Sequence, residues 1–497
     1  MEIKEFKFLL KHTSIYGIGA IVSQAASFML LPVYTRYLSP SDYGIMSLVN
    51  ISMELIGIVL GLGVSAAMAR FYYDKDDEEK RKKVISTSYL LSFGFSAVGL
   101  ILLFLSSEQL SLLIFDTRRY TNIFMVGSAA MVFELNVEIG LAYMRIKAAS
   151  TRYVIVSFTR LLMLISFNIL FVVVYKTGVI GIFYSSLITK ATFSILLTVP
   201  ILFTTGVAFS RQVAKEMMLF AYPLIFSNIP RVLVNQSDKF FINFYFTPLL
   251  TGLYTLAQRI GTSLHILMTA PFLASYLPHR FAIMKQDNAK EVYATVLRYY
   301  ILTVGTAGLG LSIFARDIVR IMTDEKFHAA SEFVPLYALG MIIFGIKYHF
   351  ETGIMIRKKT KIITLINAIA GAVNIGLNFL LIARYKIWGA LISLNASYLI
   401  TVVLNYLFAQ KMYPINFRML HVFKVFGFAG LAYAAAEFFA PRKLFLSIGV
   451  RSLIFLAYVA TVVFSGVVTR EELALAKKKV HALVRRKKIP AEALSEE

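Results

Sequence analysis

Tyr37-Leu-Ser-Pro-Ser-Asp-Tyr-Gly-Ile-Met-Ser-Leu-Val-Asn50 returns 208 residues later as Tyr245-Phe-Thr-Pro-Leu-Leu-Thr-Gly-Leu-Tyr-Thr-Leu-Ala-Gln258. Tyr, Pro, Gly and Leu recur at the same positions of the two copies, and five further pairs are chemically similar. Each copy lies in the short gap between two long apolar stretches. Parallel repeats of membrane helices are typical of transporters whose halves rock around a central site. The phrase therefore predicts two related halves, although the recurrence of Pro and Gly in short loops is an alternative.

The composition predicts a membrane protein. The chain has 497 residues, of which 58% are apolar and only 16% charged, which excludes an ordinary soluble globular protein. A helix needs about 20 mostly apolar residues to cross a bilayer. Such stretches fall at 14–35, 43–69, 84–106, 121–144, 153–175, 178–205, 216–245, 249–276, 291–315, 331–356, 362–383, 387–410, 420–440 and 444–468. We therefore predict an all-α integral membrane fold with about 14 transmembrane helices.

The repeat divides these helices into groups. We expect two six-helix lobes at residues 1–210 and 211–415, followed by two additional helices at 416–470. The tail, 471–497, has apolar residues at helical spacing among Lys and Arg, so it is expected to lie on anionic membrane lipids; a disordered basic tail is the alternative. Connections such as 107–120 are too short to form an extramembrane domain.

The net charge of +23 is explained by topology. With the N-terminus inside, the inner loops carry 32 Lys and Arg and the outer loops about 12, as the positive-inside rule requires. We therefore expect both termini in the cytoplasm, an uncleaved first helix, and no nucleic-acid partner. The chain contains no cysteine, which excludes thiol chemistry and disulfides.

Seven basic residues lie inside the apolar stretches: Arg160, Lys190, Arg231, Arg259, Arg298, Lys347 and Arg451. Each would cost roughly 2.5–3.5 kcal/mol at the bilayer centre, so each should face a cavity or a partner. Arg298 and Arg451 lie near span ends and are expected to snorkel to the interface. The other five indicate an anionic cargo, because the arginine fork suits phosphate.

Polar stripes place several of these residues together. The seventh span carries the stripe Asn228, Arg231, Asn235 and Asp238 at helical spacing. Pro223 and Pro230 interrupt that span as Pro32 interrupts the first, and broken helices at matching places indicate the binding site. A second stripe, in the eighth span, contains Gln258 and Arg259. We predict that pyrophosphate and sugar are bound by Arg231, Arg259, Lys190, Lys347, Arg160, Asn228, Asn235 and Gln258.

Acidic side chains in the spans suggest ion coupling. Glu134 and Glu138 stand one helical turn apart, where two carboxylates would share a proton or a cation. Glu54 and Asp238 are further candidates for coupling to H⁺ or Na⁺. Lys347 and Glu351 are also one turn apart, and an intrahelical ion pair is the simpler interpretation there. We expect no catalytic residue, metal or cofactor.

The start of the chain resembles a known family. Three stretches of sequence show this resemblance: Ser14-Ile-Tyr-Gly-Ile-Gly19, Leu30-Leu-Pro-Val-Tyr-Thr-Arg-Tyr-Leu38 and Ser39-Pro-Ser-Asp-Tyr-Gly44. They look like the bacterial lipid-linked oligosaccharide flippases of the multidrug/oligosaccharidyl-lipid/polysaccharide exporter superfamily. The resemblance implies two V-shaped lobes around a cationic lumen. It also implies a cargo on undecaprenyl pyrophosphate, such as an O-antigen unit for lipopolysaccharide, moved from the cytoplasmic to the periplasmic leaflet of the inner membrane by alternating access. Apart from the resemblance, we expect a monomeric carrier coupled to H⁺ or Na⁺.

Other functions stay open. A flippase for the peptidoglycan lipid precursor would share the span count and the cationic lumen. A multidrug exporter of the same superfamily is disfavoured by the basic interior. A membrane glycosyltransferase or polysaccharide polymerase is disfavoured because such enzymes usually carry catalytic residues in large periplasmic loops. We therefore predict a transporter and not an enzyme.

Overall fold

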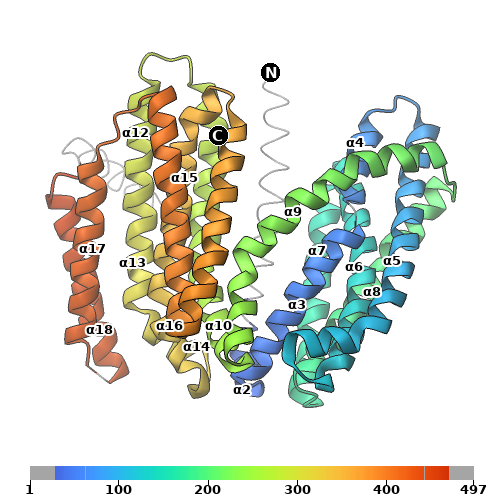
Figure 1. Cartoon of the computed structure of the whole chain (residues 1–497), viewed down its shortest axis with the longest axis horizontal. Helices are drawn as coiled ribbons and strands as arrows, with labels where there is room; N and C mark the ends of the chain where they lie inside the picture. The colour runs from blue at the N-terminus through green and yellow to red at the C-terminus, as the bar shows by residue number, and fades with distance from the viewer. Residues whose placement is uncertain (1–27, 29, 62, 442, 469–497) are drawn as a thin grey trace, which may run out of the picture. The chain divides into compact units, whose positions relative to one another are not determined.

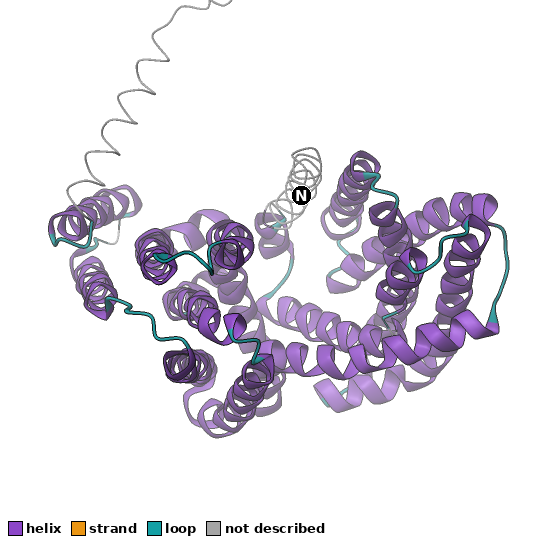
Figure 2. Cartoon of the chain, turned by 90° about the horizontal axis from the view of Figure 1, so that it is seen from above, coloured by secondary structure: helices purple, strands orange, loops and turns teal. Residues whose placement is uncertain are grey.

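Every regular element in the described part of the chain is a helix (Figure 2). The computed structural model describes residues 28, 30–61, 63–441 and 443–468. The predicted all-α fold is confirmed. The α-helices are α2 (Leu31–Tyr37), α3 (Pro40–Gly61), α4 (Val64–Tyr73), α5 (Glu78–Phe115), α6 (Thr121–Ile146), α7 (Ser150–Asn168), α8 (Val179–Thr205), α9 (Arg211–Tyr245), α10 (Pro248–Leu264), α11 (Ala270–Ala282), α12 (Ala289–Tyr300), α13 (Thr306–Ile313), α14 (Ala315–Met322), α15 (Val334–Ile356), α16 (Thr360–Met412), α17 (Met419–Phe439) and α18 (Leu444–Phe464). Short 3₁₀ turns are η1 (Arg118–Tyr120) and η5 (Glu325–Glu332), and π-helical turns are η2 (Ile169–Val174), η3 (His265–Thr269) and η4 (Ile301–Gly305).

Eleven helical segments among the described residues are long and apolar enough to cross a membrane. The 53-residue α16 counts as one of them but holds two predicted spans, 362–383 and 387–410, which meet at Lys386 with a positive φ of 54°. The predicted first span, 14–35, lies largely outside the described residues, as does the basic tail 471–497. The chain is therefore a multi-span membrane protein, and the count of fourteen stays a prediction.

Two expectations, one drawn from hydropathy and one from prolines, are corrected. The predicted connection 107–120 is helical as far as Phe115, where α5 ends. Ser106 and Ser107 dilute the hydropathy there, but their hydroxyls donate to carbonyls one turn earlier and remain compatible with a helix. The expected break in α9 is also absent: the helix is continuous over 35 residues and is bent (Figure 1). A proline can bend a helix without ending it.

The repeated phrase forms the same local structure twice. In the first copy α2 ends at Tyr37 and α3 begins at Pro40; in the second α9 ends at Tyr245 and α10 begins at Pro248. Proline suits the first helical position because its missing N–H has no helical partner there. The internal repeat therefore holds at the level of helix boundaries.

Only the first copy has a reciprocal cap. The Oγ atom of Ser39 accepts from the backbone N–H of Asp42 at 3.1 Å, and the Asp42 carboxylate accepts from the Ser39 N–H at 3.0 Å. This capping box satisfies donors that the first turn of a helix leaves unpaired. The second copy has Leu250 in place of the acid, so the side-chain half of the box cannot form.

The two copies pack against each other through their glycines. A Cβ atom on Gly44 would overlap the carbonyl oxygen of Pro248, and a Cβ on Gly252 would overlap that of Pro40. The backbones of α3 and α10 therefore touch in a reciprocal contact. Small residues allow such close approach between membrane helices.

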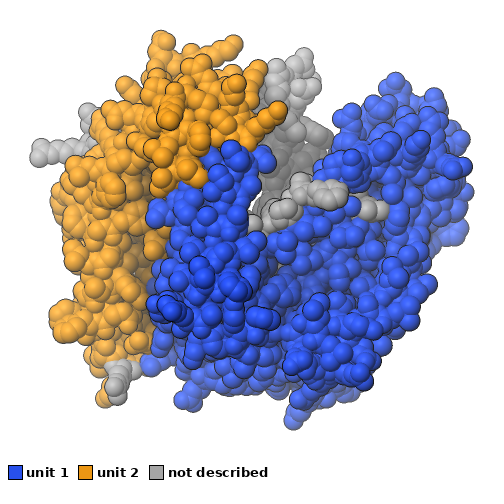
Figure 3. Space-filling view, in the orientation of Figure 1, with its two compact units in different colours: residues 1–260, 318–337, 364–401 blue, residues 261–317, 338–363, 402–497 orange. Residues whose placement is uncertain are grey.

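The chain divides into two compact units (Figure 3). Unit 1 comprises residues 1–260, 318–337 and 364–401, and unit 2 comprises 261–317, 338–363 and 402–497. In unit 1 a core of α4, α5, α6 and α9 buries a group of apolar side chains that includes Met68, Tyr72, Tyr89, Ile139 and Met217. These units cut across the expected lobes 1–210 and 211–415, and the lobes stay a prediction.

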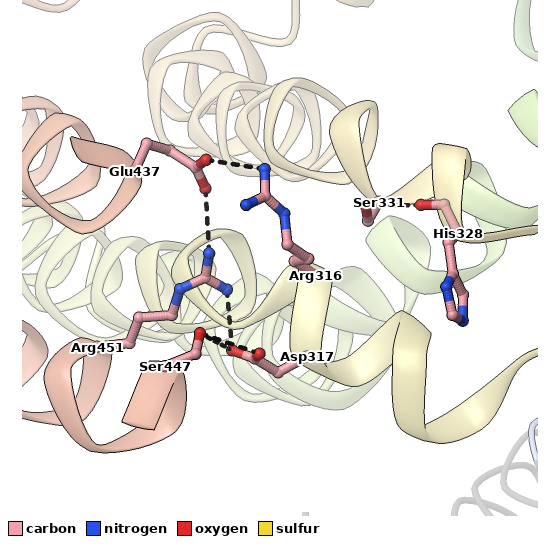
Figure 4. A network of polar contacts seen from close by, with 7 residues as sticks. All are labelled: Arg316, Asp317, His328, Ser331, Glu437, Ser447 and Arg451. Carbon is pink, nitrogen blue, oxygen red and sulfur yellow. Dashed lines mark hydrogen bonds and ion pairs between the residues drawn. The ribbon is translucent and has the colours of Figure 1, made fainter. Parts of the chain in front are cut away.

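In unit 2 the terminal helix pair, α17 and α18, is joined to α14 by ion pairs (Figure 4). Arg451 of α18 lies 2.8 Å from the Asp317 carboxylate, and its side chain is 0% exposed. Its second amino group lies 3.5 Å from Glu437, which also pairs with Arg316. The expected snorkelling of Arg451 is therefore wrong, because an acid on another helix neutralises it inside the protein.

Candidate anion-binding site beside the crossing of the repeats

Arg259 lies two turns after Gly252 on α10, beside the crossing of the two repeat copies. Its Nη1 atom donates to the hydroxyl of Tyr43, on α3, at 2.8 Å. Tyr34 of α2 lies within electrostatic range of the same guanidinium, and both tyrosines are buried. Because Tyr43 precedes Gly44 directly, the close approach of the backbones brings this phenol to Arg259.

A second group of charges lies on the adjacent helix α9. Asp238 accepts a hydrogen bond from the Tyr254 hydroxyl and another from the backbone N–H of Lys239, the latter at 2.8 Å. Asp238 and Lys239 are each 4% exposed. The ammonium of Lys239 lies within electrostatic range of Asp238, Glu54 and Arg259. Two cations, two acids and three tyrosine hydroxyl groups therefore lie beside the repeat crossing.

A separate charged cluster joins three helices of unit 1. Arg160 of α7 donates to both carboxylate oxygens of Glu134 on α6, and Lys190 of α8 lies 3.7 Å from the same carboxylate. The three side chains are only about a quarter exposed, at 23%, 26% and 27%. Two cations share one acid, so the cluster carries an excess positive charge within the helical bundle.

Glu138 faces a different environment from Glu134. It lines a cavity of about 190 Å³, together with Asn228, Ser92 and Gly61. The Nδ2 atom of Asn228 donates to the Leu224 carbonyl at 2.9 Å. The structure thus separates the two predicted coupling acids, because Glu134 is held by cations while Glu138 borders a cavity.

The remaining predicted residues take different positions. Gln258 is half-buried next to Arg259, Asn235 is half-buried on α9, and Glu54 is exposed on α3. Arg231 belongs to α9, but its side chain lies outside the described part of the structure.

Lys347 is in unit 2, on α15. Its ammonium lies over the rings of Phe344 and Tyr348, at 4.3 Å and 4.9 Å from their centroids. Cation–π contacts of this kind stabilise a cation away from water. Glu351 and His265 lie within electrostatic range. Lys347 thus belongs to a polar group of its own unit.

Sequence reasoning missed Lys239 and the role of Tyr43. Lys239 lies within the predicted seventh span and follows Asp238 directly, so it belonged among the buried cations. Tyr43 is part of the repeated phrase, but its contact with Arg259 depends on the packing of helices that are 216 residues apart. Among the described residues, no group of three or more His, Cys, Asp or Glu side chains could hold a metal ion.

The arrangement beside the crossing suits an anion. Guanidinium and ammonium groups donate charge-assisted hydrogen bonds to phosphate oxygens, and the tyrosine hydroxyls hold or orient them. Asp238 and Glu54, both within electrostatic range of Lys239, offset the positive charge when no ligand is bound. The same chemistry is available at the Glu134 cluster, where the two cations already share one carboxylate.

Comparison with known proteins gives the same fold. The chain resembles the lipid II flippase MurJ in its inward closed conformation, with a TM-score of 0.71, 16% identity, and coverage of 90% of this chain and 98% of MurJ. It also resembles an inward-facing multidrug resistance MATE family transporter of the MOP superfamily, with a TM-score of 0.61, 14% identity, and coverage of 78% and 94%. The fold is therefore one that membrane flippases and exporters use.

The sequence comparisons define the family. A relative from Haemophilus influenzae, named "Uncharacterized membrane protein", is 21% identical over 355 residues, which cover 69% of this chain and 78% of the relative. The family model described as polysaccharide biosynthesis protein matches residues 33–332. The chain belongs to this polysaccharide biosynthesis protein family.

Proposed function

We propose that this protein is a flippase that moves an oligosaccharide repeat unit, linked to undecaprenyl pyrophosphate, from the cytoplasmic to the periplasmic leaflet of the bacterial inner membrane. The family match and the transporter fold support a lipid-linked polysaccharide cargo. The observation that carries the proposal is the Arg259–Tyr43 pair with Lys239 beside the repeat crossing. It supplies fixed donors for a pyrophosphate at the centre of the repeat.

In this mechanism the pyrophosphate is bound first by Arg259 and Lys239, with Arg231 on the same helix as Lys239. Each charge-assisted hydrogen bond contributes about 1.5–3 kcal/mol when the ligand is held away from water. The sugar passes through the polar interior while the polyprenyl chain stays in lipid. Alternating access then exposes the site to the opposite leaflet, with both termini of a monomeric carrier remaining in the cytoplasm.

Coupling to H⁺ or Na⁺ is a second part of the proposal. Of the acids predicted for this role, Glu138 is favoured because it borders a cavity with an amide and a hydroxyl. Glu134 is engaged by Arg160 and Lys190, so taking up a proton there would break an ion pair. Asp238 and Glu54 would modulate the charge felt by Lys239. The matched test replaces Glu138 and Glu134 separately by Gln and compares transport with and without an ion gradient.

A flippase assay tests the main proposal. A fluorescent polyprenyl-pyrophosphate oligosaccharide is placed in proteoliposomes, and its exposure in the outer leaflet is followed with a membrane-impermeant quencher. Protein-dependent exposure is expected, with a loss of at least tenfold in Arg259→Glu and Arg231→Glu, since about 1.4 kcal/mol corresponds to a factor of ten. Arg152→Glu, on the exposed start of α7, is the matched control. Unchanged transport by Arg259→Glu would refute the assigned site.

The same assay separates the alternatives. A peptidoglycan precursor flippase would move a lipid-linked disaccharide peptide in preference to the oligosaccharide. A multidrug exporter would move a small organic cation and would leave both lipid-linked substrates in place. The MurJ-like fold specifically favours the first of these as the second candidate.

A further inference from the structure

The short helix η5 lies in a segment of the chain that leaves one unit and returns to it. Residues 318–337 belong to unit 1, whereas the chain before and after them, 261–317 and 338–363, belongs to unit 2. The segment is therefore joined covalently to unit 2 at both of its ends. The positive-inside pattern assigns the connection 316–330 to the outer face, as it does the connection after α2.

Phe327 of η5 packs against the first copy of the repeated phrase. Its ring meets the ring of Tyr43 edge-on, with the centroids 5.9 Å apart and an angle of 83° between the planes. Both side chains are 0% exposed. One residue earlier, the ammonium of Lys326 donates to the Arg36 carbonyl, in the last turn of α2, at 3.2 Å. The segment thus contacts α2 and α3 at two points.

The far end of the segment contacts α16. The ring of Phe333, which follows η5 directly, meets the Trp388 ring at a centroid distance of 5.3 Å and an angle of 66°. Asn395 donates to the Leu336 carbonyl at 3.0 Å. Both contacts join residues of unit 1. The segment is therefore held at both ends by other parts of unit 1.

Tyr43 connects this segment to the candidate anion site. Its hydroxyl accepts a hydrogen bond from Nη1 of Arg259 at 2.8 Å, while its ring is covered by Phe327. Edge-to-face packing of the ring and hydrogen bonding of the hydroxyl together fix the orientation of a buried tyrosine. A binding group that is oriented before the ligand arrives loses less conformational freedom on binding, and its affinity is correspondingly higher.

We propose that Phe327 is a positioning residue of the anion site. While η5 is in place, Phe327 holds Tyr43, and Tyr43 orients Arg259 toward the pyrophosphate. When η5 moves away, Tyr43 is released and the site loses affinity for its anion. Because the segment 318–337 continues at both ends into unit 2, movement of α13 and α15 in the transport cycle displaces η5 and favours release at the outer face. The inference rests on the proposed function, since it concerns the same site.

The test is a double-mutant cycle on the full chain in detergent, with binding of inorganic pyrophosphate measured by isothermal titration calorimetry. Phe327→Ala should weaken binding about three- to tenfold, as expected for the loss of one edge-to-face aromatic pair. Tyr43→Phe keeps the ring but removes the hydroxyl. In that background Phe327→Ala should have no further effect, because Phe327 acts through the hydroxyl. A purely structural role would give the same loss in both backgrounds.

Two further variants guard against a folding defect. Phe327→Leu keeps most of the buried volume but has no ring edge, so it should show the same pattern of losses as Phe327→Ala. Phe193→Ala is the matched control, because Phe193 is also buried in unit 1 but lies in a separate cluster with Val137, Leu141 and Leu197. This control should leave pyrophosphate binding unchanged.

A cross-link tests whether η5 must move. The chain contains no cysteine, so Arg36→Cys/Lys326→Cys can be joined specifically by a short bis-maleimide. The cross-linked protein should bind pyrophosphate as the wild type does but should no longer expose the lipid-linked oligosaccharide in proteoliposomes.

The outcomes separate this inference from the proposed function. If the wild type binds no pyrophosphate, the anion site fails and the inference fails with it. If the wild type binds, three results would overturn the inference alone: undiminished binding by Phe327→Ala, an equal loss in both Tyr43 backgrounds, or continued transport by the cross-linked protein.

Discussion

Replacing Arg451 by methionine should destabilise the protein far more than a change at an ordinary charged residue. The Arg451 side chain is fully buried, and its partner Asp317 is 3% exposed at a distance of 2.8 Å. Methionine would leave the Asp317 carboxylate with one remaining side-chain donor, the Ser447 hydroxyl at 3.2 Å. Removing one member of a buried ion pair costs about 3–5 kcal/mol, because the other charge stays without compensation.

The double variant separates charge burial from the value of the pair itself. Replacing a whole buried pair by apolar residues of similar volume is often neutral or stabilising. Arg451→Met/Asp317→Leu should therefore recover most of the stability lost in Arg451→Met. The coupling energy in this double-mutant cycle should reach about 2–3 kcal/mol, the upper range for residues in contact.

The assay is reversible unfolding of the purified protein in mixed detergent micelles. Far-UV circular dichroism monitors the loss of helix. Arg316 provides the matched control within the same network: it pairs with Glu437 at 3.3 Å but is 44% exposed. Exposed pairs contribute about 0–1 kcal/mol, so Arg316→Met should change stability by no more than that. A loss below about 1 kcal/mol in Arg451→Met, or additive losses in the double variant, would refute the reasoning.

Three further predictions follow from the fold. Gly252→Ala should destabilise the protein by about 1–3 kcal/mol or more, because the added Cβ overlaps the carbonyl oxygen of Pro40, the first residue of α3. Gly94→Ala adds a Cβ into open space and should stabilise its helix by about 0.5–1 kcal/mol. Thermal unfolding compares the two variants. Ser39→Ala should lose about 0.5–2 kcal/mol by removing the N-cap of α3, measured as a shift of the unfolding midpoint. Because the chain has no cysteine, single cysteines at Thr117 and Ala148 should react with an impermeant maleimide from the periplasm and from the cytoplasm, respectively, and the reverse pattern would contradict the assigned topology.

The sequence alone predicted what depends on local pattern. Apolar stretches of sufficient length predicted the membrane helices, and the recurrence of Pro and Gly predicted that the helix break at 37–40 would return at 245–248. Both features arise within a few residues: burial in lipid selects helices, and proline selects the first helical position.

Pairings between distant helices were not predictable from spacing. Arg160, Glu134 and Lys190 were placed correctly within spans, but one sequence cannot show that three helices bring them to a single carboxylate. Arg451 was expected to reach the interface because it lies near the end of a span. Its partner, Asp317, lies 134 residues earlier, so no local pattern in the sequence indicates the ion pair. A charged side chain near the end of a span can either snorkel to the interface or pair with an opposite charge on another helix. Which of the two occurs depends on how the helices pack.

The reciprocal glycine contact has a consequence for how this chain can vary. Gly44 faces the backbone of the second copy, and Gly252 faces the backbone of the first. A larger residue at either position would have to push back the other copy, and no change within its own copy could make room for it. Two sites far apart in the gene product thus behave as one structural position. Elsewhere in the phrase each copy can drift alone, as the loss of the acidic cap in the second copy illustrates.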